Sequence, residues 1–149
     1  MKTIAAAGLA TLLALAACTN GADGAGPTAA GAGSDPTACV RAAECTTLDP
    51  TAFAELAAAD GVVLLDVRTP QEFAEGHLEG AVNLDVADPA FTAALVTLDP
   101  DATFAVYCRS GNRSQTALAL MAQAGITAAA DLAGGIGAWA DAGLPVVTG

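Results

Sequence analysis

Basic side chains are scarce in this sequence. Its 149 residues include five lysines and arginines against 16 aspartates and glutamates, which gives a formal net charge of −11 at pH 7. An acidic surface repels polyanions, so nucleic acid and anionic lipid headgroups are not expected partners. The chain has one histidine, and no group of His, Cys and carboxylate residues has the spacing of a metal site. No dinucleotide or phosphate-loop fingerprint is found either, so we expect no metal and no other cofactor.

The apolar stretch at the amino terminus, residues 4–17, is too short for a permanent membrane span. It has about fourteen residues, whereas a spanning helix needs roughly twenty. It follows Met1 and Lys2, an arrangement that is typical of a secretory signal peptide. The stretch ends in LAAC at residues 15–18, which resembles the lipobox of bacterial lipoproteins. In that family the peptide is cut before the cysteine, which then receives a diacylglyceryl group and further acyl chains such as palmitate.

The lipobox resemblance implies that Cys18 is a lipid anchor. We therefore expect residues 1–17 to be a lipoprotein signal peptide and the chain to be held at the extracytoplasmic face of a membrane in the cell envelope. Cleavage after Ala17 without lipid, which would leave a soluble protein, is the alternative. Residues 18–37, which begin with the anchor, are rich in Gly and Ala. They offer too little apolar surface for a packed core, so a flexible tether is expected.

The remaining three cysteines are informative because free thiols are rare in the oxidising compartments that an exported chain enters. Cys39 and Cys45 lie close together in a lead-in, residues 38–47. We expect them to form a local disulfide, either as a structural staple or as a redox-active pair. Cys108 is then left without a partner, and an unpaired thiol in an exported protein indicates a chemical role.

Residues 48–149 have the size of one small domain. Its hydrophobic pattern alternates between strand and helix, and a continuous apolar run such as residues 62–65 is typical of a strand covered on both faces. The alternation predicts an α/β domain with a mainly parallel central sheet flanked by helices. The expected helices span residues 49–57, 70–74, 88–98, 114–124 and 135–142, and the expected strands span residues 62–65, 81–84, 103–107 and 126–131.

The loop CRSGNR, residues 108–113, joins an expected strand directly to an expected helix. Ligands of parallel sheets bind beyond the carboxyl ends of the strands. Successive N–H groups in a loop that enters a helix form an anion-binding nest, which stabilises a thiol at its rim as the reactive thiolate. Gly111 permits a tight turn, and Arg109 and Arg113 add positive charge. We therefore predict that Cys108 is a nucleophile.

Three stretches resemble the sequence signatures of rhodanese domains, in the order and spacing of that family. LDVRTPQEFAEGHLEGAVNL at residues 65–84 resembles the amino-terminal signature, and CRSGNRS at 108–114 resembles the active-site loop. LAGGIGAW at 132–139, with GLPV at 143–146, resembles the carboxyl-terminal signature. The resemblance implies a single rhodanese-like domain with a thiosulfate sulfurtransferase activity. Such an enzyme moves sulfane sulfur from thiosulfate or a persulfide to cyanide or a thiol.

The same resemblance assigns expected roles to individual residues. Cys108 would carry the sulfur as a persulfide, the loop N–H groups would cradle the outer sulfur, and arginine side chains would hold the sulfonate oxygens of the donor. The resemblance also implies that His77 supports the fold. From their position at the end of the preceding strand, Asp66 and Arg68 are expected to form a supporting ion pair or hydrogen-bond network beside the loop. The expected substrate-binding residues are Arg109, Ser110, Gly111, Asn112, Arg113 and Ser114.

Other functions fit part of this pattern. Phosphatases of the dual-specificity class and arsenate reductases place Cys and Arg around a similar cradle, but their loop is one residue longer between the two. A non-catalytic binding module tethered at the envelope usually lacks the cysteine that this chain retains. A redox role, in which Cys39 or Cys45 exchanges with Cys108, is a further alternative.

Overall fold

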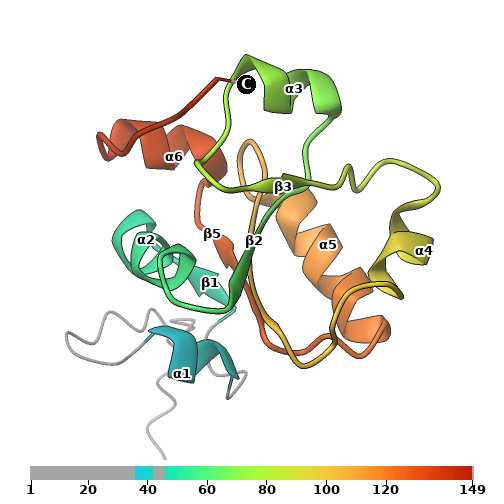
Figure 1. Ribbon diagram of the computed structural model, residues 1–149. Helices are drawn as coiled ribbons and strands as arrows, with labels where there is room; N and C mark the ends of the chain where they lie inside the picture. The colour runs from blue at the N-terminus through green and yellow to red at the C-terminus, as the bar shows by residue number, and fades with distance from the viewer. Residues whose placement is uncertain (1–35, 42–45, 149) are drawn as a thin grey trace, which may run out of the picture.

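Five strands, all paired in parallel, form the central sheet of the domain. In the computed structural model, which describes residues 36–41 and 46–148, their order across the sheet is β1-β5-β4-β2-β3 (Figure 1). The most central strand, β4, has one of the longest apolar runs, and every one of its residues is buried. The strands are β1 (Thr47–Leu48), β2 (Val62–Asp66), β3 (Val82–Asn83), β4 (Thr103–Tyr107) and β5 (Ala129–Leu132).

Helices cover both faces of this sheet. Figure 1 shows α1, α2 and α6 on one side and α4 and α5 on the other, with α3 beyond the carboxyl ends of the strands. The α/β class with a parallel sheet between helices, predicted from the sequence, is thereby confirmed. The helices are α1 (Pro36–Arg41), α2 (Pro50–Ala57), α3 (Pro70–Glu75), α4 (Phe91–Leu95), α5 (Asn112–Gln123) and α6 (Gly135–Asp141).

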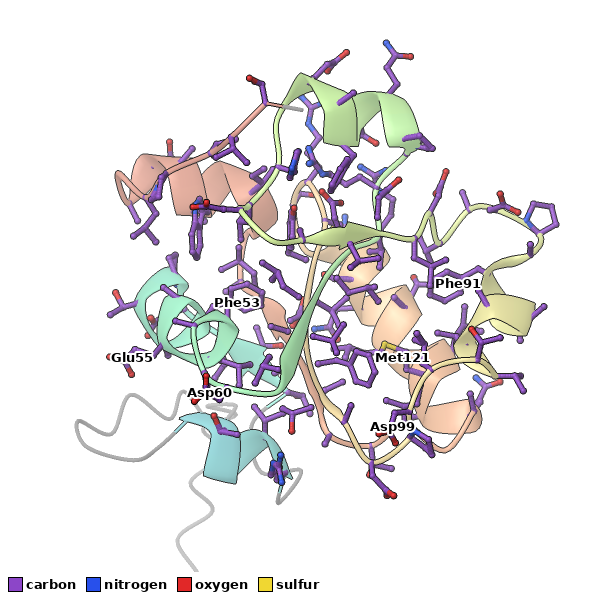
Figure 2. The ribbon with its side chains drawn as sticks, viewed as in Figure 1. Phe53, Glu55, Asp60, Phe91, Asp99 and Met121 are labelled. Carbon is purple, nitrogen blue, oxygen red and sulfur yellow. The ribbon has the colours of Figure 1, made fainter. Side chains whose placement is uncertain are left out.

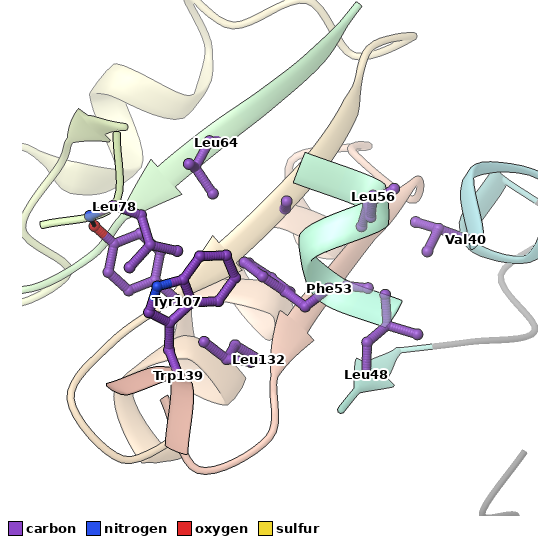
Figure 3. Packing of buried hydrophobic residues seen from close by; sticks show 11 residues of the cluster. Val40, Leu48, Phe53, Leu56, Leu64, Leu78, Tyr107, Leu132 and Trp139 are labelled. Carbon is purple, nitrogen blue, oxygen red and sulfur yellow. Dashed lines mark hydrogen bonds between the residues drawn. The ribbon is translucent and has the colours of Figure 1, made fainter. Parts of the chain in front are cut away.

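Alternate side chains of β4 enter two separate cores, as the period of a strand requires. Ala105 and Tyr107 pack with side chains of α1, α2 and α6, the cluster drawn in Figure 3. Phe104 and Val106 pack with α4 and α5 on the opposite face. Figure 2 shows the two sides through Phe53 of α2 on one and Phe91 and Met121 on the other. A central strand buried on both faces fixes the position of whatever follows it, which here is Cys108.

Side-chain caps begin α2 and α3, which both open with proline. The Asp49 carboxylate accepts hydrogen bonds from the backbone N–H groups of Thr51 and Ala52 at the start of α2. Thr69 and Glu72 form a reciprocal capping box at the start of α3. Each cap satisfies N–H groups that the first helical turn leaves unpaired, so these boundaries follow from the sequence.

Two predicted elements differ from the structure by more than a few residues in total. The strand expected over residues 126–131 begins only at Ala129, because the Ile126 N–H bonds back to Met121 O and its side chain is buried against α5. The helix expected over 88–98 is confined to residues 91–95. Its first residues instead form a turn in which the Asp88 side chain accepts a hydrogen bond from the Ala90 N–H.

The expected lead-in, residues 38–47, contributes to the folded domain. Val40 of α1 is fully buried, and Arg41 Nε donates to Thr103 Oγ1 at 3.0 Å. Thr47 begins the edge strand β1, which pairs with β5. Neither the short helix nor the two-residue strand was predicted. Cys45 lies outside the described residues and so does the side chain of Cys39, so the disulfide stays a prediction.

Candidate active site

Cys108 lies at the carboxyl end of the central strand β4, in the loop that enters α5. Its side chain is 1% exposed, and it is a free thiol. Gly111 precedes α5 with a φ of +100°, a conformation that favours glycine. This turn brings the Gly111 N–H to within 3.1 Å of Cys108 Sγ. The predicted cradle is therefore built by one glycine between a buried strand and a helix start.

Hydrogen bonds to the sulfur atom lower the pKa of Cys108. Burial alone would raise it, but this effect is outweighed by the hydrogen bond between Cys108 Sγ and the Ser114 hydroxyl group and by those from the backbone N–H groups of Ser114, Ser110 and Gly111. Ser114 Oγ lies 3.6 Å from Cys108 Sγ, within hydrogen-bonding distance for sulfur. Because these hydrogen bonds favour the charged form, Cys108 loses its proton more readily than an ordinary cysteine does.

The amino-terminal end of α6 holds the carbonyl groups of the loop. Ile136 N–H donates to Cys108 O at 2.9 Å, and Gly137 N–H donates to Arg109 O at 3.4 Å. Gly135 is the first residue of α6 and directly precedes Ile136. It has a φ of +61°, and a Cβ there would lie 2.4 Å from Cys108 O. With its carbonyls bound to α6, the loop keeps its N–H groups for the sulfur. The sequence gives no local sign of this contact, because the two segments are far apart in the chain.

The two loop arginines differ in their surroundings. Arg113 forms a bidentate pair with Glu72 of α3, with both N···O distances at 2.7 Å. The Arg113 hydrogen bond is the main reason that the pKa of Glu72 falls from 4.5 to about 2. Arg109 is exposed and forms no ion pair within the part of the chain that the structure describes. Of the two arginines predicted to bind substrate, Arg109 has the free guanidinium group.

The ion pair predicted between Asp66 and Arg68 is present beside the loop. Arg68 Nη2 lies 2.6 Å from Asp66 Oδ2, both side chains are buried, and the same nitrogen donates to Gly76 O. The guanidinium group also lies over the ring of Tyr107, with its carbon 5.7 Å from the ring centre. The pair therefore joins the end of β2 to the segment after α3 and to the last residue of β4.

His77 has structural contacts. Its ring stacks on Phe73 with the ring centres 3.8 Å apart, and its Nδ1 lies 3.0 Å from Phe73 O. Its backbone pairs with Val147 in an isolated antiparallel bridge. All of these partners belong to α3 or to the carboxyl-terminal tail, in keeping with the predicted support of the fold.

Residues 49–142 match the family model described as "Rhodanese-like domain". The chain belongs to the rhodanese-like family. A protein named "Sulfurtransferase" from Allochromatium vinosum is 40% identical over 92 residues, which cover 62% of this chain and 84% of the relative. The "Thiosulfate sulfurtransferase GlpE" of Pseudomonas putida is 38% identical over 95 residues, covering 62% of this chain and 82% of the relative.

Two solved structures have the same fold as the domain of this chain. A rhodanese-related protein from Thermoplasma volcanium is 29% identical, with a TM-score of 0.62 over 70% of this chain and 99% of its own. A thiosulfate sulfurtransferase from Pseudomonas aeruginosa is 25% identical, with a TM-score of 0.59 over 70% of this chain and 20% of its own. The longer enzyme thus contains a region that resembles this one domain.

A cavity of about 730 Å³ opens beside the active-site loop of the rhodanese-like domain. Arg109 and Ser110 belong both to the loop and to the cavity wall. The rest of the wall comes from Arg68 after β2, from α3 and the residue after it, from α6 and the residue before it, and from the tail. These lining residues include Glu75, Gly76, Gly134, Ile136, Asp141 and Val146.

Asp131 of β5 is a buried residue near the site that sequence reasoning missed. It is 1% exposed and accepts hydrogen bonds from Ser114, Thr47 and Gln115. Burial raises the pKa of its carboxyl group more than these hydrogen bonds lower it. The available signal was a lone carboxylate within the apolar run AAADL, residues 128–132.

The predicted lipidation site lies outside the residues that the structure describes. Cys18 and the whole signal region fall within residues 1–35, which are not described. Within residues 36–41 and 46–148, no helix is both long and apolar enough to cross a membrane.

Proposed function

We propose that this rhodanese-like domain is a sulfurtransferase that carries sulfane sulfur as a persulfide on Cys108. The observation that carries the proposal is the buried Cys108 sulfur, which accepts a hydrogen bond from the Gly111 N–H and has a lowered pKa. The names of the relatives from Allochromatium vinosum and Pseudomonas putida support the same activity. A thiolate held by N–H donors is the nucleophile that such a transfer requires.

The reaction has two displacement steps at sulfur. The Cys108 thiolate attacks the outer sulfur of thiosulfate or of a persulfide, a new S–S bond forms, and sulfite or a thiolate leaves with the electron pair of the old S–S bond. An acceptor, cyanide or a thiolate, then attacks the outer sulfur of the persulfide, and Cys108 leaves as a thiolate. Because the first product departs before the acceptor reacts, the kinetics are ping-pong.

The loop divides the binding work between backbone and side chain. The backbone N–H groups of the loop and of the first turn of α5 stabilise the negative charge on the outer sulfur by hydrogen bonding. The free guanidinium group of Arg109, on the cavity wall, holds the sulfonate oxygens of the donor. Arg113 remains paired with Glu72, and its positive charge attracts the negative charge on the sulfur atom. The backbone donors are those of Ser110, Gly111, Asn112, Arg113 and Ser114.

The proposed cellular setting is the envelope. The signal at residues 1–17 and the lipobox-like LAAC support export and acylation of Cys18. Several acyl chains would bind a membrane firmly, whereas one alone binds marginally. Metabolic labelling with a fatty acid analogue, compared between the natural chain and Cys18→Ser, tests this placement. Absence of label on the natural chain would rule the anchor out.

Mass spectrometry of the protein after incubation with thiosulfate tests the proposed chemistry. We expect a gain of one sulfur atom on Cys108, its loss on addition of cyanide with formation of thiocyanate, and neither in Cys108→Ser. Turnover that survives in Cys108→Ser would refute the persulfide mechanism. Efficient hydrolysis of an aryl phosphate with no sulfur gain would favour the phosphatase alternative, and ligand binding with neither reaction would favour the binding module.

A further inference from the structure

A buried carboxylate lies one hydroxyl group away from the reactive sulfur. Ser114 Oγ is 2.8 Å from Asp131 Oδ2 and 3.6 Å from Cys108 Sγ. The other carboxylate oxygen, Asp131 Oδ1, accepts from Thr47 Oγ1 at 2.8 Å and from Gln115 Nε2 at 2.7 Å. Ser114 is itself fully buried. Asp131 of β5, Ser114 of α5 and Cys108 of the active-site loop are therefore connected by a continuous chain of hydrogen bonds.

No cation compensates the charge of Asp131 within the described residues. Its partners on β1 and α5 are the neutral groups of Thr47, Ser114 and Gln115. The charged groups around the loop are Arg109, Arg113 with its partner Glu72, and the Asp66–Arg68 pair, and the Arg113 charge interacts with the sulfur. A buried carboxylate without a cation is unfavourable when ionised, and protonation relieves it.

Ser114 has a single hydroxyl proton and three neighbours that can accept it. Gly111 O lies 2.8 Å from Ser114 Oγ, in addition to Asp131 Oδ2 and Cys108 Sγ. When Asp131 is ionised, its carboxylate competes for this proton. When Asp131 is protonated, it donates to Ser114 Oγ and leaves the Ser114 proton available to the sulfur. The protonation state of Asp131 thus decides whether Ser114 can stabilise the thiolate.

We propose that Asp131 and Cys108 share one proton through Ser114, so that Asp131 is a positioning residue that stores the proton Cys108 gives up. In this exchange the S–H bond breaks, the thiol proton passes to Ser114 Oγ, and the original Ser114 proton passes to Asp131 Oδ2. The negative charge moves from the carboxylate to the sulfur, and no other reactant is needed. The exchange gives a buried thiol an internal proton acceptor where no histidine contacts it.

This inference deepens the proposed function by assigning control of the same nucleophile. It is tested without sulfur transfer, by the rate at which iodoacetamide alkylates Cys108 as the pH is varied. A pair that shares a proton titrates in two coupled steps, so the alkylation rate of the natural protein should rise in two steps. A single-step profile for the natural protein would overturn the proposal, whatever its variants do.

The variant Asp131→Asn should titrate in one step that is complete at a lower pH. The amide cannot take a proton but donates to Ser114 Oγ permanently, as the protonated carboxyl does. We expect alkylation at pH 7 to be faster by about threefold to tenfold, which corresponds to a fall of about half to one unit in the thiol pKa. An unchanged or slower rate in a variant with natural thermal stability would contradict the proposal.

Two further variants separate the route from other effects. In a Ser114→Ala background, Asp131→Asn should leave the alkylation profile unchanged, and an equal shift there would show that Ser114 is not the route. Asp60→Asn removes an exposed carboxylate in the turn before β2, at the other end of the strands, and should change nothing. If this proton coupling is found but Cys108 never gains sulfur, the proposed function fails while the inference stands.

Discussion

One sulfur atom and the few donors around it account for the chemistry proposed for this protein. Cys108 follows the central strand, Gly111 turns the chain so that its N–H reaches the sulfur, and Ser114 adds a hydroxyl group. The loop also contains one free cation, Arg109, which no part of the described fold neutralises. The residues thus separate into those that tune the nucleophile and one that faces the substrate.

Replacing Arg109 by glutamine should weaken capture of the donor. We expect the KM for thiosulfate to rise about threefold to tenfold with little change in kcat, because a substrate-facing charge is lost while the nucleophile is unaltered. Steady-state kinetics with cyanide as the acceptor measure both constants. Arg41→Gln is the matched control, since Arg41 contacts Thr103 at the amino end of β4. Equal effects in the two variants would assign the loss to net charge.

The helix α6 is the element on which the active-site loop depends. Its first N–H groups bind the carbonyls of Cys108 and Arg109, and Gly135 allows the backbones to approach. The pair between Glu72 and Arg113 ties the start of α5 to α3 in the same way. The loop is therefore held from two sides by elements that begin in glycine or proline turns.

Gly135→Ala should disable the loop. An alanine there would place its Cβ 2.4 Å from Cys108 O, so the loop must shift away from α6. We expect at least a tenfold slower alkylation of Cys108 at pH 7, with a loss of stability above the roughly 1–2 kcal/mol of a left-handed alanine. Gly143→Ala provides the control, because that glycine has a φ of +74° but a Cβ there would meet no atom within 4 Å. Identical alkylation rates for the two variants would disprove the contact's role.

Glu72→Gln should remove a pH-dependent contribution to stability. Glutamine preserves the capping box, but it cannot pair with Arg113 as a charge. Because the pKa of Glu72 is lowered from 4.5 to about 2 in the fold, its contribution is present above about pH 4.5 and is lost as the pH falls toward 2. Chemical unfolding should show a deficit of about 1 kcal/mol at pH 7 that disappears near pH 2. A deficit that persists there would mean that packing, and not charge, is responsible.

Elements with continuous apolar runs or strong caps were predictable, whereas those fixed by distant contacts were not. Residues 103–107 were predicted as a strand with the bounds that β4 has, because five apolar or β-branched residues lie between turns. The two-residue β1 has no such pattern and exists through its pairing with β5. Asp131 was missed for the same reason, since Thr47 is 84 residues away in the chain. Arg113 was predicted as a substrate ligand without its partner Glu72, which is 41 residues away.

The molecule as a whole is strongly acidic, with a formal net charge of −11, but its charges are unevenly placed. Arg68, Arg109 and Arg113 all lie at the carboxyl ends of the strands, around or beside the loop. An anionic donor therefore meets a local field that differs from the field of the whole protein. Screening at physiological salt acts over about 8 Å, so nearby arginines outweigh remote carboxylates.

Rising ionic strength should accordingly weaken the capture of thiosulfate. We expect kcat/KM to fall as salt is added, because the local attraction is screened. Measurements over a range of NaCl concentrations, with cyanide held at saturation, test this expectation. A rise in kcat/KM with salt would show that repulsion by the acidic surface dominates.

The contact between α6 and the loop also sets an order in time. The chain is synthesised from its amino terminus, so Cys108 and its loop are made before residues 135–137 exist. Until those residues arrive, nothing turns the carbonyls of Cys108 and Arg109 away from the sulfur. We therefore expect the loop to acquire its fixed form only when the last helix of the domain is in place.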